Sequence, residues 1–390
     1  MFGDLSKLLN DKNFRRVVFV FFIYKIFVIS IAVGTQFFVP AGITHTEKVT
    51  DNIFLNPFAQ YDATAYLDIA KNGYRHDFGT YEAGDYHWYP LYPFLIRVFS
   101  FIGYPLAAFL ISNVMSFLAI TFLYLLVKEE LGKKHAYKTA VYMMFFPTAF
   151  YFTTMYTESL FLFLSVSIFY FAKKGNWPLV GLLGFLVALT RMQGMLLFIP
   201  VVYIYMRSIK FDFKKIKKDV IYITGMPIGV LTFMFYEYMI TGDFLIQFKS
   251  ALVFGKQLSF PWTGFIFSIK AIFADTSFIN VSYHVYTLLM TAFFIALLCI
   301  SYKKLRPEYT IYFALSLLVI LISSNLFGAT RYFLMVFPAF MVLSLYNNKN
   351  NYIKYGIILA YIFFIIIMSG SIVLHATERI STPLFYTPLF

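Results

Sequence analysis

Charged residues and cysteines are both scarce in this chain. Asp, Glu, Lys and Arg make up 13% of its 390 residues, whereas 60% of the residues are apolar. Soluble globular domains carry about 25% charged residues, so an ordinary soluble domain is excluded. Cys299 is the only cysteine, which excludes an intrachain disulfide. Together with a mean hydropathy of +0.72, this composition predicts an all-α polytopic membrane protein.

Several motifs with known chemistry are also missing. The sequence contains no Gly-rich phosphate loop of the Walker type, no metalloprotease His-Glu motif and no convincing Ser/His/Asp arrangement, so ATP-driven transport and hydrolysis gain no support. It also lacks an Asp-x-Asp pair that would hold the metal of a nucleotide-sugar. We therefore expect a metal-independent reaction without a cofactor, although Glu82, Asp85 and His87 in "EAGDYH" could form a hard-metal cluster.

Long apolar runs recur along the whole chain. A helix needs about 20 residues to cross the hydrocarbon core, and by that rule the chain contains about eleven transmembrane helices, some of them short or tilted. The runs lie near residues 17–39, 104–127, 138–153, 158–173, 177–190, 194–207, 219–240, 283–302, 308–323, 332–346 and 353–374. They leave no room for a large soluble domain, so residues 1–390 are expected to form a single transmembrane body.

Lysine and arginine alternate with the spans and predict the orientation. If the N-terminus is cytoplasmic, every inside segment carries at least two of these residues; the segments lie at 7–16, 128–138, 173–174, 207–218, 303–306 and 349–354. This bias orients helices at insertion and predicts an N-in, C-out protein whose first span stays as a signal anchor. It also accounts for the net charge of +13 without nucleic acid as a partner. The expected location is the cell membrane of a prokaryote or the ER membrane of a eukaryote.

Acidic residues collect on the opposite side, in the predicted external loop 40–88. This acid-rich loop is the expected catalytic face, with helices at the membrane interface. The second external loop, 241–282, contains "FLIQFKSALVFGKQLSF" and "WTGFIFSIKAIF". The apolar spacing of both stretches suits helices that lie in the interface plane.

The stretch "QYDATAYLDIAKNGY" in the first loop predicts a helix from Gln60 to Asn72 with Gly73 as its C-terminal cap. At 3.6 residues per turn, Asp62 and Tyr66 share one face and Asp68 lies about 120° away. The two acids therefore do not form the facing pair of a glycosidase. Asp62 is well placed as a lone general base; the alternative is a first-turn acid that complements the helix dipole.

Five motifs follow one another between about residues 60 and 340: "YDATAYLDIAKNGY", "HWYPLYPFLIR", "FFPTAFYFTTMYTESLFLFLS", "LVALTRMQG" and "RYFLMVFPAF". In combination the array resembles the PIG-V-like family of GPI mannosyltransferases and its prokaryotic relatives, which are glycosyltransferases of the GT-C fold. The family has Trp where this chain has Tyr61, a departure that bears on the acceptor and keeps the acid. The resemblance implies a role like that in GPI-anchor biosynthesis.

The resemblance also implies a reaction. It is the inverting transfer of a sugar, typically mannose, from a polyprenyl-phosphate donor to a hydroxyl of a lipid-linked or glycan acceptor outside the cytoplasm. The acid of the first external loop is then the expected base, which is Asp62 here. Such a reaction also needs cations that stabilise the leaving phosphate.

Arg191 and Arg331 are the candidate cations, each at the predicted outer end of a span. Ionisable groups at that depth are costly unless paired or used, and the alternatives are a structural pair with Glu158 or a headgroup contact. Glu158 could orient an arginine or the sugar, or could simply complement a helix N-terminus. Gln193 and Tyr332 accompany the arginines in "TRMQG" and "TRYF" as further candidates for substrate binding.

Tyr66 joins the substrate-binding candidates because it shares a helix face with Asp62. Arg75 and Lys249 are weaker candidates for holding phosphate, because loop cations are usually only solvated. His87 and Tyr89 could line the donor or acceptor site, although aromatic residues at this level ordinarily form the interfacial belt.

Two other classes of function stay open. A lipid or glycolipid transporter or flippase would share the buried arginines, but related halves or matching broken helices are not found in the sequence. A non-enzymatic scaffold would explain the basic loops but gives no reason for the ordered motif array.

Overall fold

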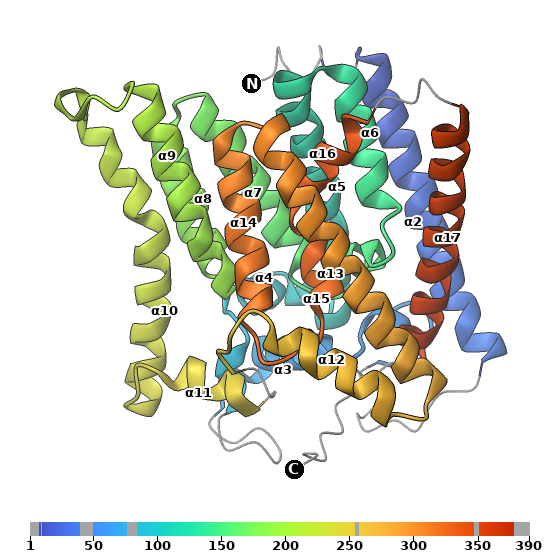
Figure 1. Cartoon of the computed structure of the whole chain (residues 1–390). Helices are drawn as coiled ribbons and strands as arrows, with labels where there is room; N and C mark the ends of the chain where they lie inside the picture. Colours follow the sequence, from blue (N-terminus) through green and yellow to red (C-terminus); the bar gives the residue numbers. More distant parts are fainter. Residues whose placement is uncertain are drawn as a thin grey trace.

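The computed structural model describes residue 8 and residues 10–39, 50–75, 84–253, 257–346 and 351–377, and these residues form a bundle of helices (Figure 1). No β-strand occurs among them, apart from an isolated bridge between Leu258 and Ser323. The α-helices are α2 (Lys12–Phe38), α3 (Asp62–Asn72), α4 (Leu91–Val98), α5 (Tyr104–Leu131), α6 (Lys133–Met144), α7 (Glu158–Lys173), α8 (Trp177–Ala188), α9 (Phe198–Ser208), α10 (Gly225–Thr241), α11 (Ile246–Val253), α12 (Thr263–Ala274), α13 (Phe278–Lys304), α14 (Pro307–Leu321), α15 (Ala329–Phe333), α16 (Phe337–Ser344) and α17 (Asn351–Ala376). Short 3₁₀ segments connect them: η1 (Asn56–Phe58), η2 (Gly84–His87), η3 (Ser100–Ile102), η4 (Ala149–Phe152), η5 (Met192–Leu197), η6 (Phe213–Lys215) and η7 (Lys218–Thr224).

Among the described residues, five helical segments are long and apolar enough to cross a membrane: Lys12–Phe38, Tyr104–Leu131, Lys218–Thr241, Phe278–Lys304 and Leu359–Ala376. The protein is therefore an integral membrane protein, and the all-α class is confirmed. Other predicted spans are shorter helices: α7 has 16 residues and α14 has 15. At 1.5 Å per residue each covers less than about 30 Å, so the count of eleven spans stays a prediction.

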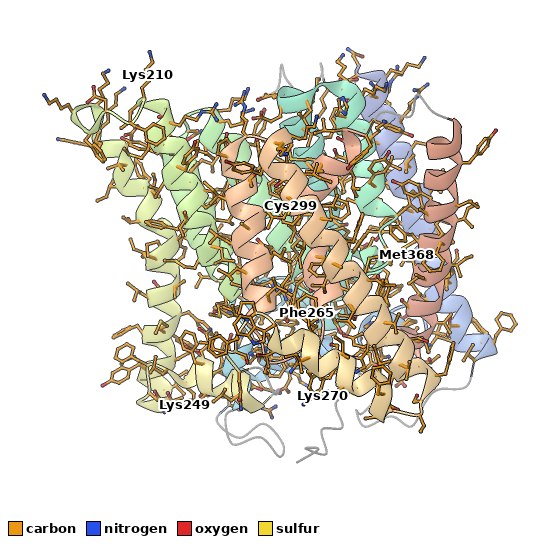
Figure 2. All side chains as sticks on the ribbon, viewed as in Figure 1. Lys210, Lys249, Phe265, Lys270, Cys299 and Met368 are labelled. Carbon is orange, nitrogen blue, oxygen red and sulfur yellow. The ribbon has the colours of Figure 1, made fainter. Side chains whose placement is uncertain are left out.

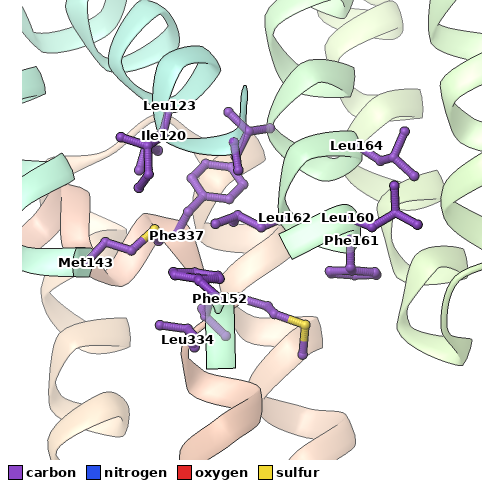
Figure 3. Close-up of a cluster of buried hydrophobic side chains, with 14 of the residues drawn as sticks. Ile120, Leu123, Met143, Phe152, Leu160, Phe161, Leu162, Leu164, Leu334 and Phe337 are labelled. Atoms are coloured by element: carbon purple, nitrogen blue, oxygen red, sulfur yellow. The ribbon is translucent and has the colours of Figure 1, made fainter. Parts of the chain in front are cut away.

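Helix α7 lies at the centre of the bundle. Its residues are buried on nearly every face between Glu158 and Phe169, and it packs against α5, α8 and α9. Side chains of α5, α6 and α16 meet those of α7 in one apolar cluster, in which Figure 3 labels Leu123, Met143, Leu162 and Phe337. The burial of this cluster fixes where the polar N-terminal end of α7 lies.

Helices α8 and α10 approach each other closely at glycines. A Cβ atom on Gly225 would overlap the carbonyl oxygen of Gly181, and one on Gly229 would lie 2.6 Å from the carbonyl oxygen of Phe185. Only glycine permits this backbone contact. The crossing holds α10 against the body of the protein, although much of the outer surface of α10 is exposed.

The two ends of the bundle differ in what they carry. Helices α3, α11 and α12 lie together at the lower end in Figure 1. Figure 2 places Lys210 at the upper end and Lys249 and Lys270 at the lower end. The segments assigned to opposite sides of the membrane thus lie at opposite ends of the bundle, while the orientation itself stays a prediction. Residues 40–49 and 76–83 of the predicted catalytic loop, including Asp77 and Glu82, lie outside the described residues.

Candidate active site

The helix expected at Gln60 begins at Asp62 and ends at Asn72, with Gly73 as the cap at a φ of 82°. Tyr61 precedes the helix at a φ of 54°, a left-handed conformation that costs a non-glycine residue about 1–3 kcal/mol. The segment before α7 fixes this turn, because Tyr156 donates a hydrogen bond to the Gln60 carbonyl (2.9 Å) and the Met155 amide donates one to the Phe58 carbonyl (3.0 Å). The start of α3 is therefore positioned by the same segment that carries Glu158.

Four charged side chains join in a row, which we call the charge chain: Asp62, Arg331, Glu158 and Arg191. Arg331 donates from Nη1 to Asp62 Oδ2 (2.6 Å) and from Nε to Glu158 Oε1. Arg191 donates from Nη1 to the same Glu158 oxygen (2.7 Å). Two carboxylates and two guanidinium groups alternate, so the formal charges of the chain cancel. Such pairing makes buried charges tolerable.

Aromatic and hydroxyl groups surround the arginines. The guanidinium carbon of Arg331 lies 4.3 Å from the ring centre of Tyr156 and 5.2 Å from that of Tyr151. Arg191 lies over the ring of Tyr332 at 5.1 Å, an arrangement that favours a cation. Arg191 also donates to Thr157 Oγ1 (3.0 Å), and the Tyr66 hydroxyl lies 3.5 Å from the same oxygen. The candidates Tyr66 and Tyr332 are thus both placed at the charge chain.

Burial changes along the charge chain. The Glu158 side chain is fully buried, whereas the Asp62 side chain is 37% exposed. Arg331 Nη2 and Arg191 Nε and Nη2 donate no hydrogen bond to any residue that the structure describes. The charge chain therefore offers an accessible carboxylate at one end and guanidinium donors beside it, which is the combination that proton removal and phosphate binding require.

Other predicted residues lie apart from the charge chain. Arg75 pairs with Asp68, which also accepts from Asn72, and Lys249 is 62% exposed and pairs with Asp243. No recorded hydrogen bond or ion pair of the described residues joins Arg75 or Lys249 to Asp62 or Glu158, so their phosphate role stays a prediction.

The last three residues predicted to bind substrate come from two segments of the chain. His87 ends η2 and packs against Trp88. Buried Tyr89 packs against Phe233 of α10. Gln193 lies in η5, two residues after Arg191.

The sequence reasoning missed buried ionisable residues within apolar helices, among them the following three. Lys25 of α2 donates to Asn113 Oδ1 (2.8 Å), to the Phe152 carbonyl (2.8 Å) and to Thr153 Oγ1 (3.1 Å). His375 of α17 packs on Tyr61 and Tyr156, and its Nε2 is buried with no hydrogen-bond partner among the described residues. Glu237 is the third. The sequence did contain a signal for these three residues, because an ionisable residue inside an apolar run is costly in a membrane and therefore marks a position of interest.

No three His, Cys, Asp or Glu residues gather closely enough to hold a metal ion within the described ranges. Glu82 lies outside those ranges, and the metal-independent reaction stays a prediction.

Residues 89–236 match the family model described as dolichyl-phosphate-mannose-protein mannosyltransferase. The match covers less than half of the chain; it contains Glu158 and Arg191, while Asp62 and Arg331 fall outside it. It supports the glycosyltransferase class predicted from the motifs, whereas the PIG-V-like family and the role in GPI-anchor biosynthesis stay predictions. No curated protein matches the chain in sequence.

Solved structures that are similar in shape include the following two. A crystal structure of the oligosaccharyltransferase from Archaeoglobus fulgidus, tethered with an acceptor peptide, is 13% identical with a TM-score of 0.46; the alignment covers 93% of this chain and 55% of that chain. ArnT from Cupriavidus metallidurans, bound to undecaprenyl phosphate, is 11% identical with a TM-score of 0.48, and the alignment covers 92% of this chain and 76% of that one. The chain thus spans about half the length of the archaeal enzyme.

Proposed function

We propose that the protein is a membrane glycosyltransferase that moves a sugar from a polyprenyl-phosphate donor to a hydroxyl of a lipid-linked or glycan acceptor. The observation that carries the proposal is the charge chain, in which the half-exposed Asp62 is bonded to Arg331 and through it to Glu158 and Arg191. The match to a mannosyltransferase family over residues 89–236 supports the same class.

The proposed step uses the carboxylate and the guanidinium groups for separate tasks. Asp62 removes the proton of the acceptor hydroxyl as that oxygen bonds to the anomeric carbon of the sugar. The bond between that carbon and the phosphate oxygen breaks, and the lipid phosphate leaves with the electron pair. Attack from the face opposite the phosphate inverts the anomeric carbon. Arg331 and Arg191 receive the phosphate charge, and a guanidinium suits this task because its donors match phosphate oxygens in pairs.

The Asp62–Arg331 ion pair couples the two tasks. Before the reaction, the Asp62 carboxylate balances part of the Arg331 charge. Once Asp62 holds the proton it is neutral, and the charge chain then carries one net positive charge. That charge develops as the phosphate departs, so the electrostatic stabilisation is greatest late in the reaction, where it lowers the barrier.

Several finer features belong to the same proposal. The sugar is mannose, the acceptor lies on the extracytoplasmic side, and the reaction needs no metal, as in the PIG-V-like family that the motifs resemble. The absence of an Asp-x-Asp sequence and the arginine pair beside Asp62 support a lipid-phosphate donor over a nucleotide-sugar.

A transfer assay with Asp62→Asn and Asp68→Asn tests the proposal. Purified protein is incubated with radiolabelled polyprenyl-phosphate mannose or glucose and a native lipid extract. Asp62→Asn should lower the rate by about 100-fold or more, the usual contribution of a positioned base. Asp68→Asn is the matched control, because Asp68 lies on the same helix but pairs with Arg75. Equal losses in the two variants, both normally folded, would overturn the assignment of the base.

A further inference from the structure

Glu237 is a fully buried acidic residue near the C-terminal end of α10, and neither of its carboxyl oxygens has a hydrogen-bond partner among the described residues. Gln247 of α11 is also buried, and its side-chain nitrogen likewise makes no hydrogen bond of ordinary geometry there. Buried polar groups are nearly always satisfied, so each exception calls for a physical reason. Two such exceptions, one acceptor and one donor, lie on adjacent helices that contact each other.

Tyrosines link the two groups. Phe233, one helical turn before Glu237, packs against Tyr74 (5.6 Å between ring centres) and Tyr89 (5.3 Å), which places both tyrosines on the Glu237 side of α10. Burial raises the pKa of the Tyr89 hydroxyl, the Glu237 charge raises it further, and a contact with Gln247 lowers it. Burial followed by Glu237 also raises the pKa of Tyr74. The ring contact with Phe233 places Tyr89 on the Glu237 side of α10, and the effect of Gln247 on its pKa agrees with a position near α11.

The position of Tyr89 connects this cluster to the charge chain. The Leu91 amide donates a hydrogen bond to the Leu189 carbonyl (2.9 Å), which joins the segment of Tyr89 to the segment of Arg191. In keeping with this, the positive charge of Arg191 lowers the pKa of the Tyr89 hydroxyl. On the outer side, Tyr236 packs against Tyr74 at 5.8 Å and is 46% exposed. The cluster thus lies just beneath the surface and next to the proposed phosphate-binding arginines.

We propose that Glu237 and Gln247 form a sugar-binding subsite in which they hold hydroxyl groups of a sugar ring that packs against Tyr89 and Tyr74. The Glu237 carboxyl group accepts hydrogen bonds and, when protonated, also donates one, whereas the Gln247 amide nitrogen only donates, so the ligand must supply acceptors as well as donors. Neighbouring hydroxyls of a sugar do this, whereas an ammonium group donates only and would leave Gln247 unsatisfied. The choice of a sugar rests on the proposed function, and the subsite would hold either the transferred sugar or a sugar of the acceptor.

Binding without turnover gives the first test. Thermal unfolding of the purified full chain in detergent is followed with methyl mannoside or methyl glucoside at increasing concentration. The unfolding midpoint should rise, and the apparent affinity should fall by about tenfold or more in Glu237→Leu. The ligand-free midpoint of Glu237→Leu should not be lower than that of the unchanged protein, because leucine removes an unsatisfied buried carboxylate. Glu308→Gln is the control, since Glu308 is also buried but pairs with Arg207.

The outcomes separate the subsite from the proposed reaction. Asp62→Asn should keep the glycoside shift even though it lowers transfer by about 100-fold or more, so loss of transfer alone does not test the subsite. In the transfer assay, a higher KM of Glu237→Leu for the lipid-phosphate sugar assigns the subsite to the donor, and a higher KM for the acceptor assigns it to the acceptor. Equal glycoside shifts in Glu237→Leu and the unchanged protein, a shift with ethanolamine but not with glycosides, or an unchanged KM for both substrates would overturn the inference.

Discussion

Replacement of Glu158 by glutamine should destabilise the protein strongly. Its Oε1 accepts hydrogen bonds from both Arg191 and Arg331, and its side chain is fully buried. Glutamine keeps an acceptor oxygen but removes the charge, so two guanidinium groups lose their shared counter-ion. Breaking a buried ion pair by removing one partner costs about 3–5 kcal/mol. Arg331 keeps Asp62 as a charged partner, whereas Arg191 keeps Thr157, the Tyr332 ring and the neutral glutamine but no charged partner among the described residues.

At about 2 °C per kcal/mol for a large domain, the unfolding midpoint should fall by about 6–10 °C. Fluorescence-detected size exclusion after heating in detergent measures the midpoint without requiring activity. The matched control is Glu308→Gln, because the Arg207 partner of Glu308 is about half exposed and can turn to water. Its midpoint should fall by less than half as much.

A second substitution tests the reason for the loss. In the Glu158→Gln background, Arg191→Met removes the cation that is left without a charged partner, and part of the lost stability should return. A midpoint for Glu158→Gln within a degree of the unchanged protein, or equal to that of Glu308→Gln, would refute the reasoning. A further fall on adding Arg191→Met would show that Arg191 does not depend on Glu158.

Further predictions follow from the same geometry. Arg331→Ala should lower transfer by about 100-fold or more, and Arg331→Lys should recover only part because an ammonium lacks the guanidinium fork; full activity of the alanine variant would contradict this. Transfer should survive EDTA, and loss that manganese restores, or turnover of GDP-mannose, would refute the donor assignment. In a Cys299→Ser background, a cysteine at Lys249 should label in intact cells and one at Lys215 only after permeabilisation; equal labelling would contradict the topology. Burial raises the pKa of Asp85 to about 6, above its unfolded value of about 3.9, so its ionisation lowers stability as the pH rises through this range. Asp85→Asn should therefore raise the unfolding midpoint at pH 7.5 but not at pH 4, and a gain independent of pH would exclude this cause.

Local periodicity predicted the parts of the site that depend on one element. The helical phase placed Asp62 and Tyr66 on one face, and Asp68 indeed turns away to Arg75. Gly73 ends the helix as expected because glycine adopts the positive φ of the cap without cost. The membrane cost of ionisable groups singled out Arg191 and Arg331.

The arrangement of these parts could not be read from the sequence. Arg331 and Asp62 are separated by 269 positions, and no local pattern encodes contacts over that distance. Glu237 and His375 were passed over because hydropathy averages a single polar residue into its apolar surroundings. Lys249 and Arg75 were chosen for their charge alone, and their actual partners are the nearby acids Asp243 and Asp68.

Lys25 has a consequence for how the protein is made. Helix α2 enters the membrane with a lysine whose carbonyl acceptor at Phe152 lies 127 positions later in the chain. At a synthesis rate of about 5–20 residues per second, that acceptor emerges about 6–25 s afterwards. During this interval the lysine must stay with water or with the insertion machinery, since an unpaired charge in hydrocarbon is costly. The final packing of α2 therefore waits for the segment that carries Tyr156 and Glu158, so α2 and this part of the charge chain reach their native positions in one late step of biogenesis.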